Sequence, residues 1–344
     1  MSASSLHTAR AALFQQLATT LRNGLPPAEV VEVLVHDDQW TARSRVALRR
    51  VAARLDTGDA LPDAMASEPR LFGPELTQLV RDALALAPAQ AADVLSALAS
   101  DERRLATARR VVASAMTWPL TLGCVLLVEL VACAFYVRPA ILQAFEAMRA
   151  VPPAVFPAGV LIDTGWLWLP PIYLVLLLWH VGWLPRGVRA LLDAGAGRIG
   201  FVRRWRAADA TGRLLDWLPL CHAQPALQAA VAAQLAASEP SAGGRAAARR
   251  IGAAFQRGTP LVEALSAERA LPPRMALLAR LGERSATLPA VLADLQRDAA
   301  EDEALAFARF ERGSVLLTYA VIGLLVAQLL IGVYLPIFKI GALI

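Results

Sequence analysis

The sequence has little of what most catalytic and metal-binding sites need. It holds three cysteines and four histidines, and no Cys-x-x-Cys or spaced Cys/His set, which argues against a zinc site or a disulfide framework. Cys221 and His222 are adjacent, and neighbouring side chains of this kind rarely aim at each other as nucleophile and base. Motifs such as GxxxxGK[ST], GxSxG and HExxH are missing. We therefore expect no enzyme, no cofactor and no metal site.

Alternating runs of β-branched residues are also missing, which argues against β-structure. The N-terminal region lacks the continuous apolar core of a signal peptide, since "ARAALFQQLATTLRNGLPP" is amphipathic. Nothing there predicts removal or export of this end. We therefore expect the N-terminus to stay in the cytoplasm.

Apolar residues are abundant, at 56% of the chain against about 45–50% in ordinary globular domains. Three runs are long enough to cross a bilayer at ~1.5 Å per helical residue. The second run carries tryptophans at both ends, where such rings favour the membrane–water interface. These runs predict three transmembrane helices, at 117–137, 166–184 and 315–335.

The arginines predict how the three helices are oriented. They cluster in the segments 1–116 and 185–314, whereas 138–165 has only Arg138 and Arg149. The positive-inside rule places the two arginine-rich segments in the cytoplasm, and 138–165 and 336–344 in the periplasm. This topology accounts for the net charge of +5, so no nucleic-acid partner is expected. Prolines are expected to end the first and third helices, at Pro139 and Pro336.

The two cytoplasmic segments resemble each other at a spacing of about 200 residues. "TGDALPDAM" (57–65) aligns with "RGTPLVEAL" (257–265), which pairs Gly58 with Gly258. "LFGPELTQLVRDAL" (71–84) aligns with "LPPRMALLARLGE" (271–283), and "ADVLSALASDERR" aligns with "PAVLADLQRDAAE". Apolar positions keep helical spacing in both copies. We therefore expect an all-α integral membrane protein with three transmembrane helices and two repeated cytoplasmic helical-bundle domains, 1–116 and 185–314.

Several stretches resemble one known family over nearly the whole chain. They are "LATTLRNGLPPAEVVEVL", "RGTPLVEAL", "LPPRMALLARLGERSATLPAVLADLQRDAAEDE" and the terminal "YLPIFKIGALI". The chain is similar in them to the F-domain inner-membrane platform proteins of type II secretion systems and type IV pilus machines. The family's Gly-Glu-x-x-Gly-x-Leu stretch reads "GERSATL" here, with Ala286 in place of the second glycine. The short N-terminus looks more like the platform proteins of type IVb pilus systems.

The resemblance implies a scaffold in the bacterial inner membrane. Such a protein couples a cytoplasmic hexameric ATPase to pilin extraction and filament assembly. The implied partners are that ATPase, pilin or pseudopilin subunits, other inner-membrane assembly proteins, membrane lipid and further copies of the chain. The alternatives are the equivalent platform of a type II secretion system, a transporter subunit and an intramembrane enzyme.

Acidic side chains are the candidate partner contacts. Glu129 lies within the first apolar run, where a charge is expensive, and it either contacts a pilin or another protomer, or forms a helix–helix contact. Glu283 either docks the ATPase or holds a structural ion, or is a helix-start carboxylate favoured by the helix dipole. An acidic run either meets a basic patch of the ATPase or is a solvated face. The run comprises Asp298, Glu301, Asp302 and Glu303.

Overall fold

The computed structural model describes residues 3–24, 27–35, 40, 42–147, 149, 167, 169–175, 177–178, 188, 195, 198–239 and 242–341. All regular structure in these residues is helical, which confirms the predicted all-α class. The chain divides into two compact units. Unit 1 comprises Met1–Arg110 and Asp193–Phe307, and unit 2 comprises Val111–Leu192 and Ala308–Ile344.

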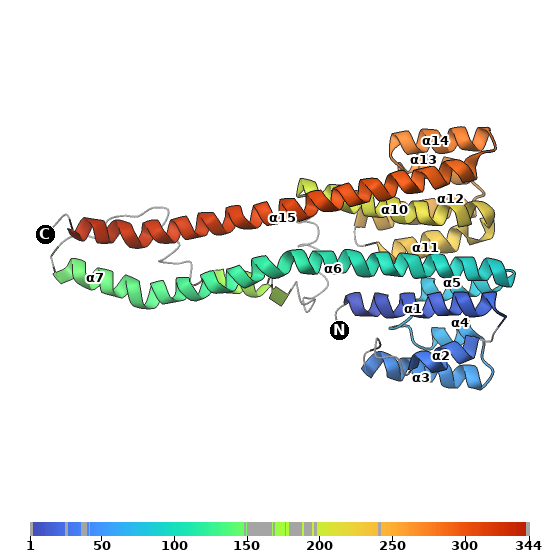
Figure 1. The fold of residues 1–344 in the computed structure, drawn as a ribbon, viewed down its shortest axis with the longest axis horizontal. Coiled ribbons are helices and arrows are strands. Elements are labelled where there is room, and N and C mark those ends of the chain that lie inside the picture. Colours follow the sequence, from blue (N-terminus) through green and yellow to red (C-terminus); the bar gives the residue numbers. More distant parts are fainter. Residues whose placement is uncertain are drawn as a thin grey trace. The chain divides into compact units, whose positions relative to one another are not determined.

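Unit 1 contains most of both segments that the sequence predicts to be cytoplasmic, 1–116 and 185–314 (Figure 1). The helices of its first half, residues 1–110, are α1 (Ala3–Arg22), α2 (Pro27–Val35), α3 (Ala42–Asp56), α4 (Leu61–Ala66), α5 (Pro74–Leu84) and the start of α6 (Pro88–Ala132). Those of its second half, residues 193–307, are α10 (Gly200–Ala223), the short 3-10 helix η2 (Pro225–Leu227), α11 (Gln228–Ser238), α12 (Ala242–Gln256), α13 (Leu261–Ala267), α14 (Pro273–Arg284) and the start of α15 (Leu288–Gly341).

Two glycines end matching helices in the two halves. Gly58 follows α3 with φ +92°, and Gly258 follows α12 with φ +80°, a left-handed conformation that only glycine adopts without strain. Each glycine N–H donates to the carbonyl three residues back, to Leu55 and Phe255 respectively, and the next residue's N–H donates to the carbonyl five residues back. This is the Schellman arrangement that closes a helix C-terminus. The spacing of 200 residues therefore holds in the backbone as well as in the sequence.

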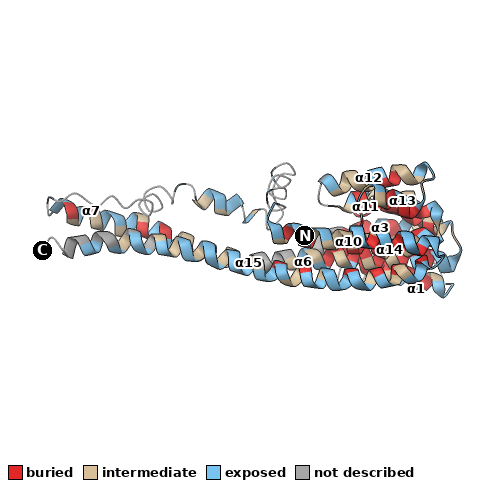
Figure 2. Ribbon diagram, turned by 90° about the horizontal axis from the view of Figure 1, so that it is seen from above, coloured by how far each residue is buried: buried red, intermediate tan, exposed pale blue. Residues whose placement is uncertain are grey.

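One hydrophobic core serves both halves of unit 1 (Figure 2). Phe14, Trp40 and Phe72 of the first half and Trp217 of the second are fully buried and belong to one contiguous cluster. Helix α5 packs against α11, so an element of one half is covered by an element of the other. Residues 1–110 and 193–307 therefore stabilise each other.

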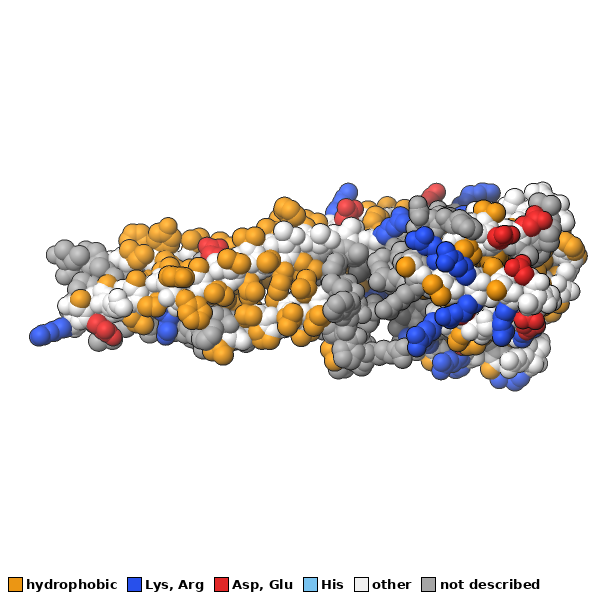
Figure 3. Space-filling view, turned by 90° about the horizontal axis from the view of Figure 1, so that it is seen from below, with side chains coloured by type: hydrophobic (Ala, Val, Ile, Leu, Met, Phe, Trp, Pro, Cys, Tyr) orange, Lys and Arg blue, Asp and Glu red, His pale blue; other side chains and the backbone are white. Residues whose placement is uncertain are grey.

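Unit 2 has almost no core of its own. Among the described residues its buried cluster is Leu130 and Cys133, with a few partly buried neighbours. Most of its large apolar side chains are exposed, and they cover the visible face of its long helices (Figure 3). Within the part of the chain that the structure describes, two helical stretches are long and apolar enough to cross a membrane, Leu120–Ala147 and Leu288–Gln328, the second of which begins in unit 1. They contain most of the predicted helices 117–137 and 315–335.

The sequence predicts that helices end at Pro139 and Pro336. This prediction is wrong, because the helix continues past both prolines. Before Pro139 the backbone widens into a π-helix, η1 (Cys133–Val137), and then continues as α7 (Arg138–Ala147). A π-turn absorbs the missing N–H and the clash of the proline ring with the preceding turn. Likewise α15 passes Pro336 and runs to Gly341. A single lost hydrogen bond does not break a long helix whose other bonds remain.

Much of the predicted second transmembrane helix, 166–184, lies outside the described residues. The part that is described, 167, 169–175 and 177–178, is helical. There the Tyr173 hydroxyl donates to the Leu120 carbonyl at 2.5 Å. A Cβ on Gly123 would lie 2.9 Å from the Tyr173 ring, so glycine is what allows this approach. The predicted segment 138–165 is described only to residue 147 and at Arg149.

Candidate functional site: a buried ionic joint in unit 1

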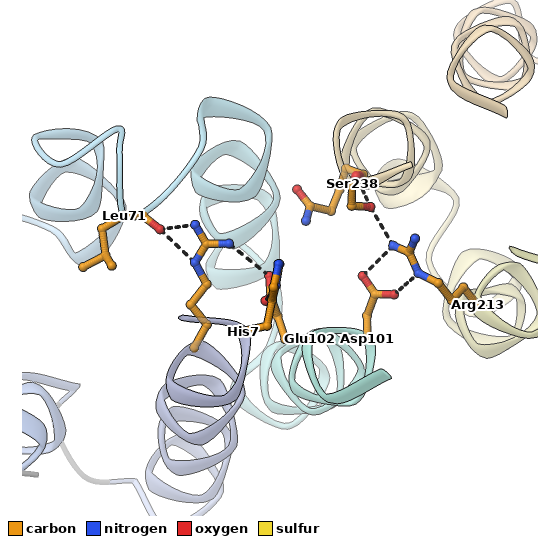
Figure 4. Close-up of polar contacts among 8 residues, drawn as sticks. His7, Leu71, Asp101, Glu102, Arg213 and Ser238 are labelled. Atoms are coloured by element: carbon orange, nitrogen blue, oxygen red, sulfur yellow. Dashed lines mark hydrogen bonds and ion pairs between the residues drawn. The ribbon is translucent and has the colours of Figure 1, made fainter. Parts of the chain in front are cut away.

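Two consecutive carboxylates on α6, Asp101 and Glu102, are both buried in unit 1 (Figure 4). Successive residues of an α-helix point about 100° apart. The two side chains therefore face different neighbours, one in each half of unit 1. A buried carboxylate is retained only with compensating partners, and both have them.

Glu102 binds within the first half. Its carboxylate contacts the Nδ1 atom of His7 on α1 and lies 3.5 Å from a terminal nitrogen of Arg10. The Nε atom of Arg10 donates to the carbonyl of Leu71, just before α5, at 2.8 Å. This group therefore ties α1, α6 and the segment leading into α5 to one another.

Asp101 binds across to the second half. Arg213 on α10 donates to both carboxylate oxygens of Asp101, through Nε at 2.6 Å and a terminal nitrogen at 3.0 Å. The same terminal nitrogen donates to the hydroxyl of Ser238, the last residue of α11, at 2.6 Å. Such forked arginine–carboxylate pairs are geometrically specific. The pair joins α6 to α10 and α11.

One helical turn further along α6, Arg104 makes a second connection between the halves. Its Nε atom lies 2.9 Å from Asp216 on α10, and a terminal nitrogen lies 2.7 Å from Glu303 on α15. A Cβ on Gly212 would lie 2.5 Å from that nitrogen. Glycine at this position leaves the room in which the guanidinium of Arg104 sits.

The joint perturbs the acidity of its members. Burial raises the pKa of Asp209, on α10, to about 6, although Arg213 and Arg104 oppose the shift. Burial also raises the pKa of Asp216 despite its pairing with Arg104. For Arg213, burial lowers the pKa, but the charge and hydrogen bonds of Asp101 together with the charges of Asp209 and Glu239 outweigh it, and the net shift is upward. Arg213 is thus held firmly charged.

Carboxylates outnumber guanidinium groups in this joint. The ionic joint between the halves comprises Asp101, Asp209, Asp216 and Glu303 against Arg104 and Arg213, whereas the Glu102 group lies within the first half. Among the residues that the structure describes, no group of three acidic, histidine or cysteine side chains is placed to hold a metal ion. The carboxylates Asp101, Asp216 and Glu303 are engaged by arginine, so the arrangement is suited to holding helices in place.

The structure separates the predicted acidic run. Glu303 pairs with Arg104 inside the joint. Asp298, Glu301 and Asp302 are exposed, and none of the described residues forms an ion pair or hydrogen bond with them. Of the four acidic residues in the run, Glu303 therefore has a structural role, and the other three face solvent.

The other two candidates lie apart from the joint. Glu129 is exposed on the part of α6 that belongs to unit 2, without a hydrogen bond or ion pair from any described residue. Glu283 lies in the last turn of α14, so the helix-start alternative is wrong. At that end the helix dipole disfavours a negative charge.

Sequence reasoning missed the joint. Asp101 and Glu102 follow Leu95 and Leu98 at the spacing of the buried stripe on α6. Charged residues at positions where apolar ones are due were the signal available. Arg104 was considered only as one of the arginines that place segment 1–116 in the cytoplasm.

Comparison with known proteins relates the chain to a protein family and to a curated relative. Residues 13–139 match the model of a family described as type II secretion system (T2SS), protein F. The chain is 27% identical to the type 4 fimbrial assembly protein PilC of Pseudomonas putida, over 354 residues that cover 96% of this chain and 83% of that relative.

Proposed function

We propose that this chain is the inner-membrane platform protein of a type IV pilus assembly system and a member of the type II secretion system protein F family, whose model its residues 13–139 match. The observation that carries this proposal is the similarity to a fimbrial assembly protein along almost the entire chain. Two long apolar helices and an otherwise helical, charged unit fit a membrane-anchored scaffold.

In this proposal the platform couples a cytoplasmic hexameric ATPase to the extraction of pilins from the membrane. Unit 1 is cytoplasmic and consists of two repeated helical bundles, an assignment supported by the equivalent turns at Gly58 and Gly258. Unit 2 provides three transmembrane helices with the N-terminus inside. The arginine-rich flanks of the apolar runs support this orientation.

The ionic joint has a mechanical role in this function. A platform that transmits the motion of a motor needs cytoplasmic parts that move together. Asp101–Arg213 and Arg104–Glu303 join segments far apart in the sequence into one unit with one core. We propose that the joint keeps the two bundles acting as a single body.

Three exposed sites remain proposed partner contacts. Glu129 is proposed to meet a pilin or another protomer within the membrane, because an unpaired carboxylate there requires a protein or water neighbour. Glu283 is proposed as a contact of the ATPase. The exposed carboxylates Asp298, Glu301 and Asp302 are proposed to meet a basic surface of an assembly partner, for which the ATPase is one candidate.

A type II secretion platform is the second candidate, favoured by the description of the matching family. Deletion of the gene, followed by electron microscopy of surface filaments and assay of secreted proteins, tests both. Loss of filaments, restored by the wild-type gene, is expected. Loss of secretion with normal filaments would instead support the secretion system. Normal filaments and normal secretion would refute both assignments.

The role of Glu129 is tested in the same strain. Glu129→Gln keeps a polar group, whereas Glu129→Leu removes it. We expect filaments with glutamine and few or none with leucine. Full assembly with leucine would show that polarity at this position is not required.

A further inference from the structure

Helix α14 presents an apolar face that unit 1 does not cover. Leu277 and Leu281 are 58% and 51% exposed. They are four residues apart, so they lie on the same face of the helix, one turn from each other. Two neighbouring exposed leucines differ from apolar residues scattered singly over a surface.

The equivalent face of the first half is polar. In the alignment of 71–84 with 271–283, the helix starts Pro74 and Pro273 correspond, and Leu277 and Leu281 take the places of Gln78 and Asp82. The amide of Gln78 donates to the carboxylate of Asp82 at 2.7 Å. A helix at this place in the bundle therefore does not need an apolar outer face. The leucines of α14 call for another explanation.

Arginines frame the two leucines. Arg274 lies three residues before Leu277, and Arg284 lies three residues after Leu281, at helical neighbour positions. Both are exposed, and no described residue forms an ion pair with either. We call Arg274, Leu277, Leu281 and Arg284 the arginine–leucine face. It suits a partner helix with apolar and acidic side chains.

Helix α15 of the same chain has a surface of that chemistry. Asp298, Glu301, Asp302 and Leu305 follow each other at i, i+3, i+4 and i+7, so they form one stripe on the helix. Leu305 is 55% exposed, and the three carboxylates have no partner among the described residues. We call these four residues the acidic stripe.

We propose that the arginine–leucine face of one copy binds the acidic stripe of a second copy. The two surfaces carry opposite unpaired charges and exposed leucines, so contact pairs the charges and buries apolar area. Two copies that exchange these surfaces make the same contact twice, as a two-fold symmetric dimer requires. The inference names the partner of the acidic run. It concerns self-association only, so its failure would leave the proposed function standing.

A charge exchange between two tagged forms of the full chain tests the proposal. The first form carries Arg274→Glu and Arg284→Glu, and the second carries Asp298→Arg and Asp302→Arg. Each form alone faces like charges and should self-associate about tenfold more weakly than wild type or worse, by sedimentation in detergent. Mixed, the two forms should co-purify through either tag, because both contacts of the dimer are again between opposite charges.

The role of the two leucines is tested by replacing each with the residue at the aligned position of the first half, Gln78 or Asp82. Leu277→Gln with Leu281→Asp should also weaken self-association by about tenfold or more. Val33→Gln is the matched control, because Val33 on α2 is 68% exposed and lies outside both surfaces. The control should associate like wild type. Circular dichroism melting checks that every variant is folded.

Three results would overturn the proposal. One is unchanged self-association of both charge-reversed forms when each is alone. Another is failure of the two folded forms to associate when mixed. The third is that variants of the arginine–leucine face self-associate normally but no longer bind the assembly ATPase. That result would assign the arginine–leucine face to the ATPase.

Discussion

The two halves of unit 1 follow the same order of helices yet place equivalent residues in different environments. Helix α5 is packed against α11 inside the unit, whereas its counterpart α14 keeps two leucines exposed. In the alignment of "ADVLSALASDERR" with "PAVLADLQRDAAE", the buried Asp101 corresponds to the exposed Asp298, and the buried Glu102 corresponds to Ala299. Aligned residues on α6 and α15 thus lie at similar places on their helices, yet they differ in burial and in their partners.

The largest effect is expected from removing the carboxylate whose burial differs most from that of its aligned counterpart. Asp101→Ala leaves Arg213 buried without its partner and should lower the free energy of unfolding by about 3–5 kcal/mol. Asp298→Ala removes the equivalent exposed side chain and should change it by about 0.5 kcal/mol or less. Denaturant unfolding of the full chain in detergent measures both. Similar losses for the two variants would contradict the asymmetry.

The next effect concerns pH. Asp209 has a folded-state pKa of about 6, above the ordinary value of 3.8, so the folded chain binds more protons than the unfolded chain between these values. Its contribution to stability is therefore greatest below pH 3.8 and is lost as the pH rises through about 6. Asp209→Asn should remove that loss and raise the free energy of unfolding at pH 8 by at most about 3 kcal/mol. Unfolding curves at several pH values, compared with those of Asp294→Asn at an exposed position, measure the effect. Equal pH profiles for wild type and Asp209→Asn would rule it out.

A smaller effect on stability should follow from exchanging glycine and alanine at the aligned positions 282 and 83, where helices pack closely. A Cβ on Gly282 would lie 2.9 Å from Val291 and 3.2 Å from the backbone of Leu288. Gly282→Ala should therefore lower the free energy of unfolding by about 1–2 kcal/mol through overpacking. The aligned position in the first half holds the buried Ala83, where Ala83→Gly should cost about 1 kcal/mol. A stabilising Gly282→Ala, seen by thermal unfolding, would show that α14 can shift away from α15.

The smallest expected loss of stability concerns the glycine turn that the two halves share. Gly58→Ala and Gly258→Ala each place a Cβ at positive φ, with open space around it. Each should cost about 1 kcal/mol from backbone strain alone. Because the two turns have the same hydrogen bonds, the two losses in unfolding free energy should agree closely. A large difference would mean that the turns are not equivalent.

Local chemistry in the sequence accounts for much of the fold. The glycines after α3 and α12, the prolines at the starts of α5 and α14 and the apolar runs within α6 and α15 all act over a few residues. The ionic joint acts over much longer separations, since Asp101 and Arg213 are 112 residues apart. No short pattern marks such a pair. The helix past Pro139 was also missed, because the π-helix that accommodates it has no distinct signature in composition.

The separation of Asp101 from Arg213 also has a consequence for biosynthesis. Residues Val111–Leu192, which belong to unit 2, are made between them. At ribosomal rates of about 5–20 residues per second, Arg213 follows Asp101 with a delay on the order of 10 s. Throughout that interval the nascent first half carries a carboxylate without its guanidinium partner and an incomplete core. The ionic joint and the shared core of unit 1 therefore close only after α10 has been synthesised.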